Sequence, residues 1–183
     1  MPALPAENSG RRVYTIGHST RTFDELLALL QTNGVSTLVD VRSFPSSRKF
    51  PQWNQDAIID ALPDTIGYRW LQNLGGRRHT TKGVPSVNTA WRVKAFGDYA
   101  DYMATDGFAS GLAELLQIET ESVPAIMCSE AVPWRCHRRL ITDALIVAGV
   151  EVYNIMSKSS TTSAELTPFA RVQGSLITYP DET

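Results

Sequence analysis

The sequence lacks the features that would place the protein in a membrane or outside the cell. Its 183 residues contain no run approaching the ~18 apolar residues that a membrane-spanning helix needs. Its first seven residues lack the basic and then apolar layout of a secretory signal. Only two cysteines are present, Cys128 and Cys136, which are too few for a disulfide scaffold. We therefore expect a cytoplasmic protein, free of the membrane, whose two cysteines are thiols.

A large net charge of either sign is also missing. The net charge is −2, so the chain as a whole does not have the charge of a polyanion-binding protein. The charge is nevertheless uneven, because residues 42–94 hold nine Lys or Arg against three Asp. A second basic group lies at residues 135–139. If the two groups meet in space they form an anion site, and otherwise they are solvated surface.

Strand-like and helix-like segments alternate along the chain. The β-rich runs 13–18 and 37–41 flank an amphipathic segment that Thr22 and Glu25 open as a capping box. This order predicts a βαβ unit with a parallel pair of strands. We expect further strands at 68–71, 124–128 and 150–156, and helices at 54–61, 90–103, 108–118 and 133–147. The sequence therefore predicts an α/β three-layer sandwich, with a mostly parallel central sheet and helices on both faces.

The two ends of the chain differ in composition from its middle. Residues 1–12 have two prolines, a glycine and no periodicity, so we expect a disordered leader. Residues 13–156 are expected to form a single α/β domain. Residues 157–183 begin with a Ser/Thr-rich stretch, which predicts a mobile loop over 157–163 followed by a C-terminal tail that packs on the domain.

Polar side chains follow three of the expected strands. His18 ends the first strand, Asp40 and Arg42 end the second, and Cys128 with Glu130 ends a later one. Ligands of α/β proteins bind at the carboxyl ends of parallel strands. We therefore expect these three loops to face one cleft.

The segment 128–138 is the densest in reactive side chains. A Cys at a strand end, followed by an Arg-bearing loop and a helix, resembles the layout of cysteine phosphatases. Six residues separate Cys128 from Arg135, rather than the usual five, and the phosphate-cradling glycines are missing, which disfavours a true phosphatase loop. A metal could instead be held by soft ligands, namely Cys128, Cys136, His137 and His18. The Cys-x7-Cys-His spacing is not a usual zinc knuckle, so no metal ligand is assigned, and each Cys could also be a buried small side chain.

The run 42–50 combines cations, hydroxyls and aromatic rings. Its Arg42, Ser43 and Arg48 suit a phosphate or carboxylate, and its two Phe rings could stack on a base. Asp40 is expected to pair with an arginine and fix its fork rather than act as a base. Two glycines precede two arginines at 75–78, which fits either a flap over an anion or a surface turn.

Two motifs are specific when they occur together: Asp-Val-Arg-Ser at 40–43 and Cys-x-Glu-x5-Cys-His-Arg at 128–138. The chain also carries Tyr-Thr-Ile-Gly-His at 14–18 and Leu-Thr-Pro at 166–168. With these motifs the chain resembles the bacterial and archaeal family called domain of unknown function 488, over residues 13–180. The resemblance implies a three-layer α/β domain and a cytoplasmic location, and it implies no activity. His18 departs from the pattern, since many members carry an aromatic such as tyrosine there.

We expect an enzyme that acts on a phosphate-bearing substrate, a nucleotide or nucleic acid, in a cleft at the strand ends. The anion would be held by four side chains: Arg42, Ser43, Arg48 and Arg138. The candidate catalytic residues are Cys128 as a nucleophile or a wall of the pocket, Glu130 as acid or base, and His137 as a group that tunes Cys136 or Glu130. Supporting positions are Asp40, His18 and Cys136.

Two other functions fit the same residues. A non-catalytic module could bind nucleic acid through the basic region 42–94, with an affinity that falls steeply with salt. A thiol or metal sensor could use Cys128 and Cys136. The residues leave the substrate, the reaction type, the cofactor and the oligomeric state open.

Overall fold

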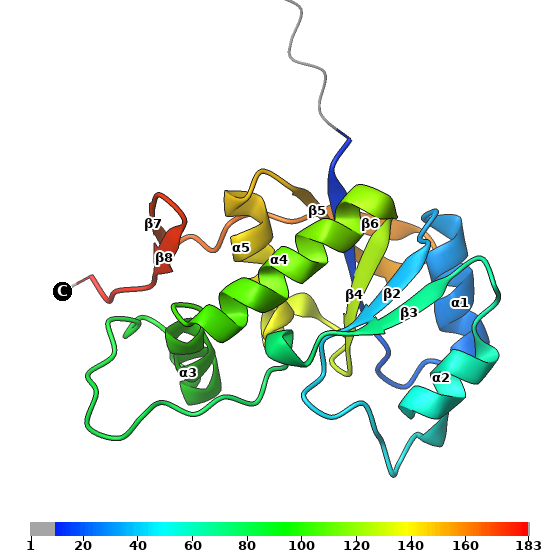
Figure 1. Cartoon of the computed structure of the whole chain (residues 1–183), viewed down its shortest axis with the longest axis horizontal. Helices are drawn as coiled ribbons and strands as arrows, with labels where there is room; N and C mark the ends of the chain where they lie inside the picture. The colour runs from blue at the N-terminus through cyan, green and yellow to red at the C-terminus, as the bar shows by residue number, and fades with distance from the viewer. Residues whose placement is uncertain (1–9, 183) are drawn as a thin grey trace, which may run out of the picture.

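The computed structural model describes residues 10–182, and its centre is a six-stranded sheet with the order β3-β2-β4-β1-β5-β6 (Figure 1). The first five strands of that order run parallel, and β6 pairs antiparallel with β5 at one edge. A separate hairpin consists of β7 and β8. The strands are β1 (Arg12–Gly17), β2 (Thr37–Asp40), β3 (Gly67–Trp70), β4 (Pro124–Cys128), β5 (Glu151–Ser157), β6 (Ser160–Ser163), β7 (Arg171–Gln173) and β8 (Leu176–Thr178).

Helices cover both faces of this sheet, which gives the three-layer α/β sandwich predicted from the sequence. The α-helices are α1 (Phe23–Thr32), α2 (Gln55–Ala61), α3 (Lys94–Tyr102), α4 (Asp106–Glu121) and α5 (Arg138–Val147). Three short 3-10 helices are η1 (Pro51–Trp53), η2 (Gln72–Leu74) and η3 (Pro133–Arg135). Figure 1 shows α1 and α2 together on one side of the sheet, away from α3, α4 and α5.

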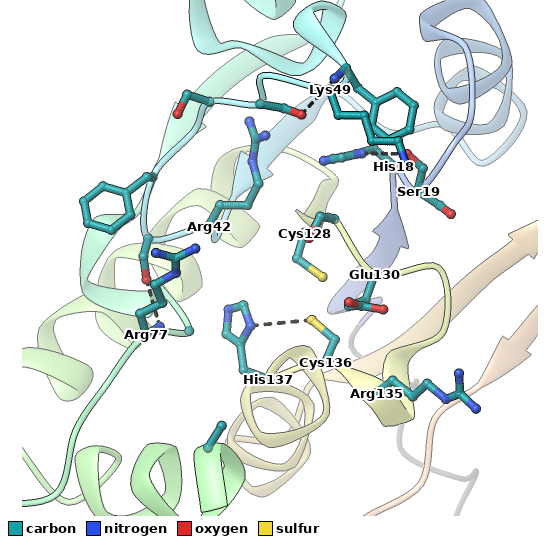
Figure 2. Close-up of a pocket in the computed structure, with 18 of the residues that line it drawn as sticks. His18, Ser19, Arg42, Lys49, Arg77, Cys128, Glu130, Arg135, Cys136 and His137 are labelled. Atoms are coloured by element: carbon teal, nitrogen blue, oxygen red, sulfur yellow. Dashed lines mark hydrogen bonds between the residues drawn. The ribbon is translucent and has the colours of Figure 1, made fainter. Parts of the chain in front are cut away.

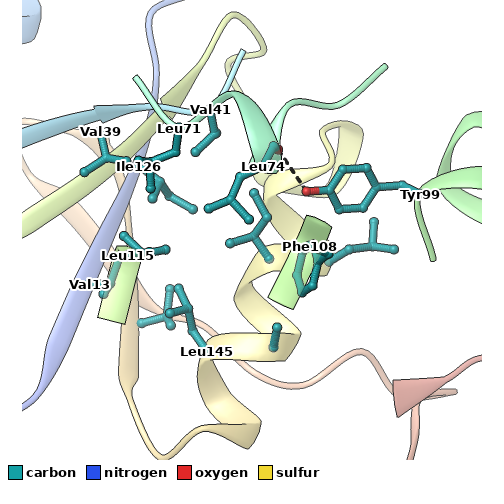
Figure 3. Close-up of a cluster of buried hydrophobic side chains, with 14 of the residues drawn as sticks. Val13, Val39, Val41, Leu71, Leu74, Tyr99, Phe108, Leu115, Ile126 and Leu145 are labelled. Atoms are coloured by element: carbon teal, nitrogen blue, oxygen red, sulfur yellow. Dashed lines mark hydrogen bonds between the residues drawn. The ribbon is translucent and has the colours of Figure 1, made fainter. Parts of the chain in front are cut away.

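The two layers of core follow from the alternation of side chains along buried strands. In β4, Ala125 and Met127 pack with α1 and α2, whereas Ile126 and Cys128 pack with α4 and α5. Figure 3 shows the second cluster, where Leu115 of α4 and Leu145 of α5 meet side chains of the sheet. Because both faces are covered, the central strands are apolar nearly throughout, as expected for a parallel sheet.

The strand order creates a switch point between β1 and β4. These strands are neighbours, but β1 leads into α1 on one face and β4 leads towards α5 on the other. The helices that follow these strands thus lie on opposite faces, and a crevice at the carboxyl edge of the sheet is expected at such a point. The pairing continues into the loops, because the His18 amide donates to the Cys128 carbonyl at 2.9 Å and the Ser19 amide to the Ser129 carbonyl at 3.0 Å.

Gly17 permits this close approach of the two loops. A Cβ atom at position 17 would lie 1.7 Å from the Glu130 carbonyl oxygen, so no other residue fits without moving backbone. The turn that follows is tight, and Ser19 adopts a φ of 46°, in the left-handed region that favours glycine. The crevice is therefore built from backbone that has little freedom to move.

Several sequence predictions need correction. β1 and β2 are parallel, as expected, but they do not pair, because β4 lies between them. The helix expected at 90–103 begins only at Lys94, since the Ala90 amide bonds the Tyr179 carbonyl instead. The helix expected at 133–147 is broken into η3 and α5 by the extended backbone of Cys136. The loop expected at 157–163 contains β6, whose hydroxyl-bearing residues suit a sheet edge.

The described residues include part of the expected leader and most of the expected tail. Residues 1–9 lie outside the described residues, and β1 already begins at Arg12, within the segment expected to be disordered. In the tail, the fully buried Tyr179 donates its hydroxyl to Asp143 of α5 at 2.8 Å, and its amide donates to Asn88 at 2.9 Å. None of the helices in residues 10–182 has both the length and the apolar character needed to cross a bilayer.

Candidate active site

A cavity of about 840 Å³ opens at the carboxyl edge of the sheet, at the switch point between β1 and β4 (Figure 2). Its volume is in the range of small-molecule binding sites. The loops after β1, β2 and β4 all contribute to its walls, through His18, Arg42 and Cys128 respectively. Cys136 and His137, at the start of α5, complete the inner wall. The structure thus brings the three expected strand ends to one cavity.

Asp40, beneath this cavity, and Arg42, in its wall, form a fixed pair. Arg42 donates through Nε and Nη2 to the two carboxylate oxygens of Asp40, at 2.9 and 2.7 Å. Tyr68 also donates to Asp40, at 2.7 Å, and Asp40 is fully buried. Burial alone would lower the pKa of Arg42, but the bonds and charge of Asp40 raise it. Asp40 is therefore occupied as an anchor for the guanidinium, as expected, and Arg42 stays a cation.

The two thiols face one another at the inner end of the cavity (Figure 2). Arg138 lies behind them, and the two thiols influence each other's pKa. The Arg138 guanidinium donates to the Cys128 sulfur at 3.0 Å, to the Thr15 hydroxyl at 3.0 Å and to the Glu130 carbonyl at 2.7 Å. With 1% of its surface exposed, Arg138 does not reach the cavity. Its positive charge therefore influences the pKa values of the thiols from the buried side, without contacting a ligand in the cavity.

This arrangement separates the pKa values of the two thiols. Burial would raise the pKa of Cys136, but the Cys128 hydrogen bond, the Arg138 charge and the Arg138 amide together lower it to about 7. Burial raises the pKa of Cys128 well above its usual value, and the hydrogen bond and negative charge of Cys136 add to that effect. The pair therefore holds one proton on Cys128 and leaves Cys136 as the thiolate near neutral pH.

His137 has a tautomer set by its surroundings. Its Nε2 lies 2.8 Å from the Val41 carbonyl oxygen, which can only accept, so Nε2 carries the proton. Nδ1 is then unprotonated and lies 3.5 Å from the Cys136 sulfur. Burial lowers the pKa of His137, which keeps the ring neutral. Gly76 makes room for this ring, because a Cβ there would lie 2.6 Å from Nδ1.

Cationic side chains line the outer part of the cavity. Lys49, Arg77 and Arg135 are there, and within residues 10–182 none of the three forms an ion pair. The Arg77 amide donates to the Ser43 hydroxyl at 2.8 Å, and its guanidinium lies over the Phe44 ring. Arg135 extends away from the thiols (Figure 2). Glu130 is the one carboxylate among the described residues that line the cavity.

Residues 22–145 match the family described as Domain of unknown function DUF488. The chain belongs to the DUF488 family. The matched segment includes the Asp40–Arg42 pair, both thiols and His137, and it begins after His18. No curated protein and no solved structure matches this chain.

The DUF488 site brings together most, but not all, of the residues singled out in the sequence. Seven of them line the cavity: His18, Arg42, Ser43, Cys128, Glu130, Cys136 and His137. Arg48 is exposed outside it, and Arg138 and Asp40 lie beneath it. Sequence reasoning missed Lys49 and Arg77 as lining cations, although both occur in the basic segments noted above. Within residues 10–182, no cluster of three or more His, Cys, Asp or Glu side chains is placed to hold a metal ion.

Proposed function

We propose that this DUF488 protein is an enzyme that binds a phosphate-bearing substrate, a nucleotide or nucleic acid, and attacks it with the thiolate of Cys136. One observation carries the proposal: a thiol whose pKa is lowered to about 7 opens onto a cavity lined by cations. Perturbed nucleophiles in clefts are common at catalytic sites. In this proposal the nucleophile is Cys136, and Cys128 is the neighbouring thiol that helps to lower its pKa.

The charges around the cavity support an anionic substrate. Lys49 and Arg77 have no carboxylate partner within residues 10–182, so a bound phosphate would be their counter-ion. Arg42, fixed by Asp40, would offer a third positive charge at a defined position. Phe44 and Phe50 also line the cavity and offer ring faces for a base. A nucleotide would contact both groups of side chains, with its phosphate on the cations and its base on the aromatic rings.

The side chains near the sulfur suggest how the reaction would proceed. The Cys136 thiolate, beside the neutral ring of His137, forms a bond to the electrophilic carbon or phosphorus atom of the substrate. The bond to the leaving group breaks, and the leaving atom keeps the electron pair and takes a proton from a water molecule held by the Glu130 carboxylate. The hydroxide formed from that water displaces the sulfur, which restores the thiolate.

A thermal-shift screen tests this proposal. The purified protein is heated with nucleotides, sugar phosphates, short single and double strands and divalent metals. A ligand at 100 times its Kd adds about 2.7 kcal/mol to the free energy of unfolding, which gives a clear rise in Tm. We expect a nucleotide to raise the Tm of the wild type and of Cys136→Ser, and to raise that of Arg77→Ala much less. Arg48→Ala is the matched control, because Arg48 lies outside the cavity.

Turnover of the ligand found in the screen completes the test. Cys136→Ser should abolish product formation without loss of binding, and Cys128→Ser should retain measurable activity because a hydroxyl can still donate to Cys136. A shift with polynucleotides alone, equal in wild type and Cys136→Ser and falling steeply with salt, would contradict the proposal and favour a binding module.

The two free thiols that face one another favour one second candidate, a thiol sensor. In that case the Cys136 thiolate attacks a peroxide, forms a sulfenic acid and releases hydroxide. Cys128 then displaces water from that sulfur to form a disulfide. Peroxide treatment followed by mass spectrometry distinguishes the two functions. A reversible loss of two hydrogen masses, without any nucleotide shift, would favour the sensor.

A further inference from the structure

His18 has an unusual position in the wall of the cavity. The side chain is 3% exposed, and its ring stacks on the fully buried Trp53, with 4.7 Å between ring centroids and 14° between planes. Figure 2 shows the ring at the opposite end of the cavity from His137. The catalytic steps proposed above make no use of this residue.

The hydrogen bonds of His18 fix which nitrogen carries its proton. Nδ1 lies 3.1 Å from the Ser19 carbonyl oxygen, which can only accept, so Nδ1 is the donor. In a neutral ring Nε2 is then an acceptor. Nε2 is buried and has no hydrogen-bond partner within residues 10–182. A buried acceptor without a partner is rare in folded proteins and calls for a donor from outside.

The ring stays neutral at physiological pH. Burial lowers the pKa of His18 to about 4, and the Arg42 and Arg138 charges act in the same direction, against the Ser19 carbonyl and Asp40, which raise it. Nε2 therefore remains an acceptor and does not become a second donor. A fully ionised phosphate brings no proton to such an atom, so His18 is not part of the anion site formed by the cations.

The surroundings indicate which part of a ligand would supply the donor. Phe50 and Lys49 line the same cavity as His18, and Trp53 stacks on the His18 ring. A flat group with an N–H in its plane fits between such walls, as a nucleobase does. The acceptor and the cations occupy one cavity, so a base and a phosphate of one molecule could be held together.

We propose that Nε2 of His18 is the acceptor of a nucleobase subsite, and that it binds a ring or amino N–H of the substrate base. The inference rests on the proposed function, in which the cations bind the phosphate of the substrate. It adds that His18 recognises the base of the same substrate. The substrate class is thereby narrowed to nucleotides whose base presents an N–H, as against sugar phosphates or phosphate alone.

The test compares binding of UMP, CMP, AMP and GMP with that of ribose 5-phosphate, by isothermal titration. We expect at least one nucleotide to bind the wild type about tenfold more tightly than ribose 5-phosphate, and His18→Phe to remove that gain. His18→Gln, which keeps an acceptor, should retain part of it. His79→Phe is the matched control, since His79 is exposed and lies outside the cavity.

A second measurement keeps the inference testable if His18→Phe does not fold. The ring nitrogens of wild-type His18 are followed by 15N NMR, with and without the best-bound nucleotide. Formation of the bond should move the Nε2 signal, which a purely structural histidine would not show. Methylation of the base nitrogen that donates should reduce affinity by about tenfold and leave the Nε2 signal in its free position.

The outcomes separate this inference from the proposed function. Equal affinity for ribose 5-phosphate and every nucleotide, or unchanged affinity in a folded His18→Phe, would overturn the base subsite while the phosphate site and Cys136 chemistry stand. If neither phosphate nor any nucleotide binds, both fail. If His18→Phe weakens ribose 5-phosphate as much as the nucleotides, the donor is a sugar hydroxyl, and the base subsite is wrong.

Discussion

The inner end and the outer rim of the cavity are built on different principles. The inner end consists of buried side chains on regular elements or directly after them: Cys128 on β4, Arg138 at the start of α5, and Arg42, two residues after β2 and bonded to Asp40. The rim consists of exposed or half-buried side chains on the irregular segments 43–50 and 75–77. The rim cations have no ion-pair partners within residues 10–182, whereas the inner ones are fully engaged.

This difference indicates a division of labour. Reactive groups need fixed distances and tuned pKa values, and only packed elements with buried charges provide both. Groups that bind an incoming ligand need access to solvent and charges that are not already paired, and side chains on loops provide both. Changes at the inner end should therefore alter stability or thiol chemistry, and changes at the rim should alter affinity alone.

Gly17→Ala should have the largest effect, on stability. The new Cβ would overlap the Glu130 carbonyl oxygen, and because the clash is with backbone no rotamer can relieve it. We expect a loss of about 3 kcal/mol or more in the free energy of unfolding measured in urea. Gly67→Ala is the control, since its Cβ would meet nothing closer than 3.9 Å, and it should change stability by less than about 1 kcal/mol. Equal stabilities of the two variants would show that the loop after β4 is not held against β1.

Cys128→Ala should have the next largest effect, on thiol chemistry. It removes the S–H donor that lowers the pKa of Cys136, so that pKa should rise from about 7 towards the usual thiol value. At pH 7 the thiolate fraction, and with it the rate of alkylation by iodoacetamide, should fall by about tenfold. Cys128→Ser keeps a donor and should lie between wild type and Cys128→Ala. An alkylation rate unaffected by both changes would mean that Cys128 does not tune Cys136.

Rim substitutions should have the smallest effects. Lys49→Ala and Arg77→Ala each remove one exposed or half-buried cation, and each should weaken phosphate or nucleotide binding by about three- to tenfold, less so at high salt. Neither should change the Tm of the free protein by more than a degree or two. Arg48→Ala should leave binding unchanged, because Arg48 is outside the cavity. If Arg48→Ala weakened binding as much as Arg77→Ala, the anion would bind to the general surface charge.

The inner end could be predicted better from the sequence than the rim. The strands that lead to His18, Asp40 and Cys128 are marked by apolar runs, and their carboxyl ends meet by the rules of parallel sheets. The Asp40–Arg42 pair followed from opposite charges two residues apart at the end of a buried strand. Local order also identified the capping box at Thr22 and Glu25, which the structure contains.

The remaining features depend on tertiary contacts that no local pattern encodes. The position of β4 between β1 and β2 is one of several strand orders that the same strands and helices could adopt. The burial of Arg138 follows from the break at Cys136, which directs the first turn of α5 beneath the sheet end. Which of the two thiols has the lowered pKa depends on the relative positions of both sulfurs and the Arg138 guanidinium. These positions exist only in the folded protein. The Lys49 and Arg77 positions depend on loop conformation, where periodicity is absent.

The pH dependence of Cys136 alkylation in the wild-type protein tests the central claim most directly. Iodoacetamide is applied at pH 5 to 10, and mass spectrometry identifies which cysteine is modified and how fast. We expect Cys136 to be modified first, with a midpoint near pH 7, and inorganic phosphate to slow the reaction. Modification of Cys128 first, or a Cys136 midpoint at or above the usual thiol value, would contradict that claim.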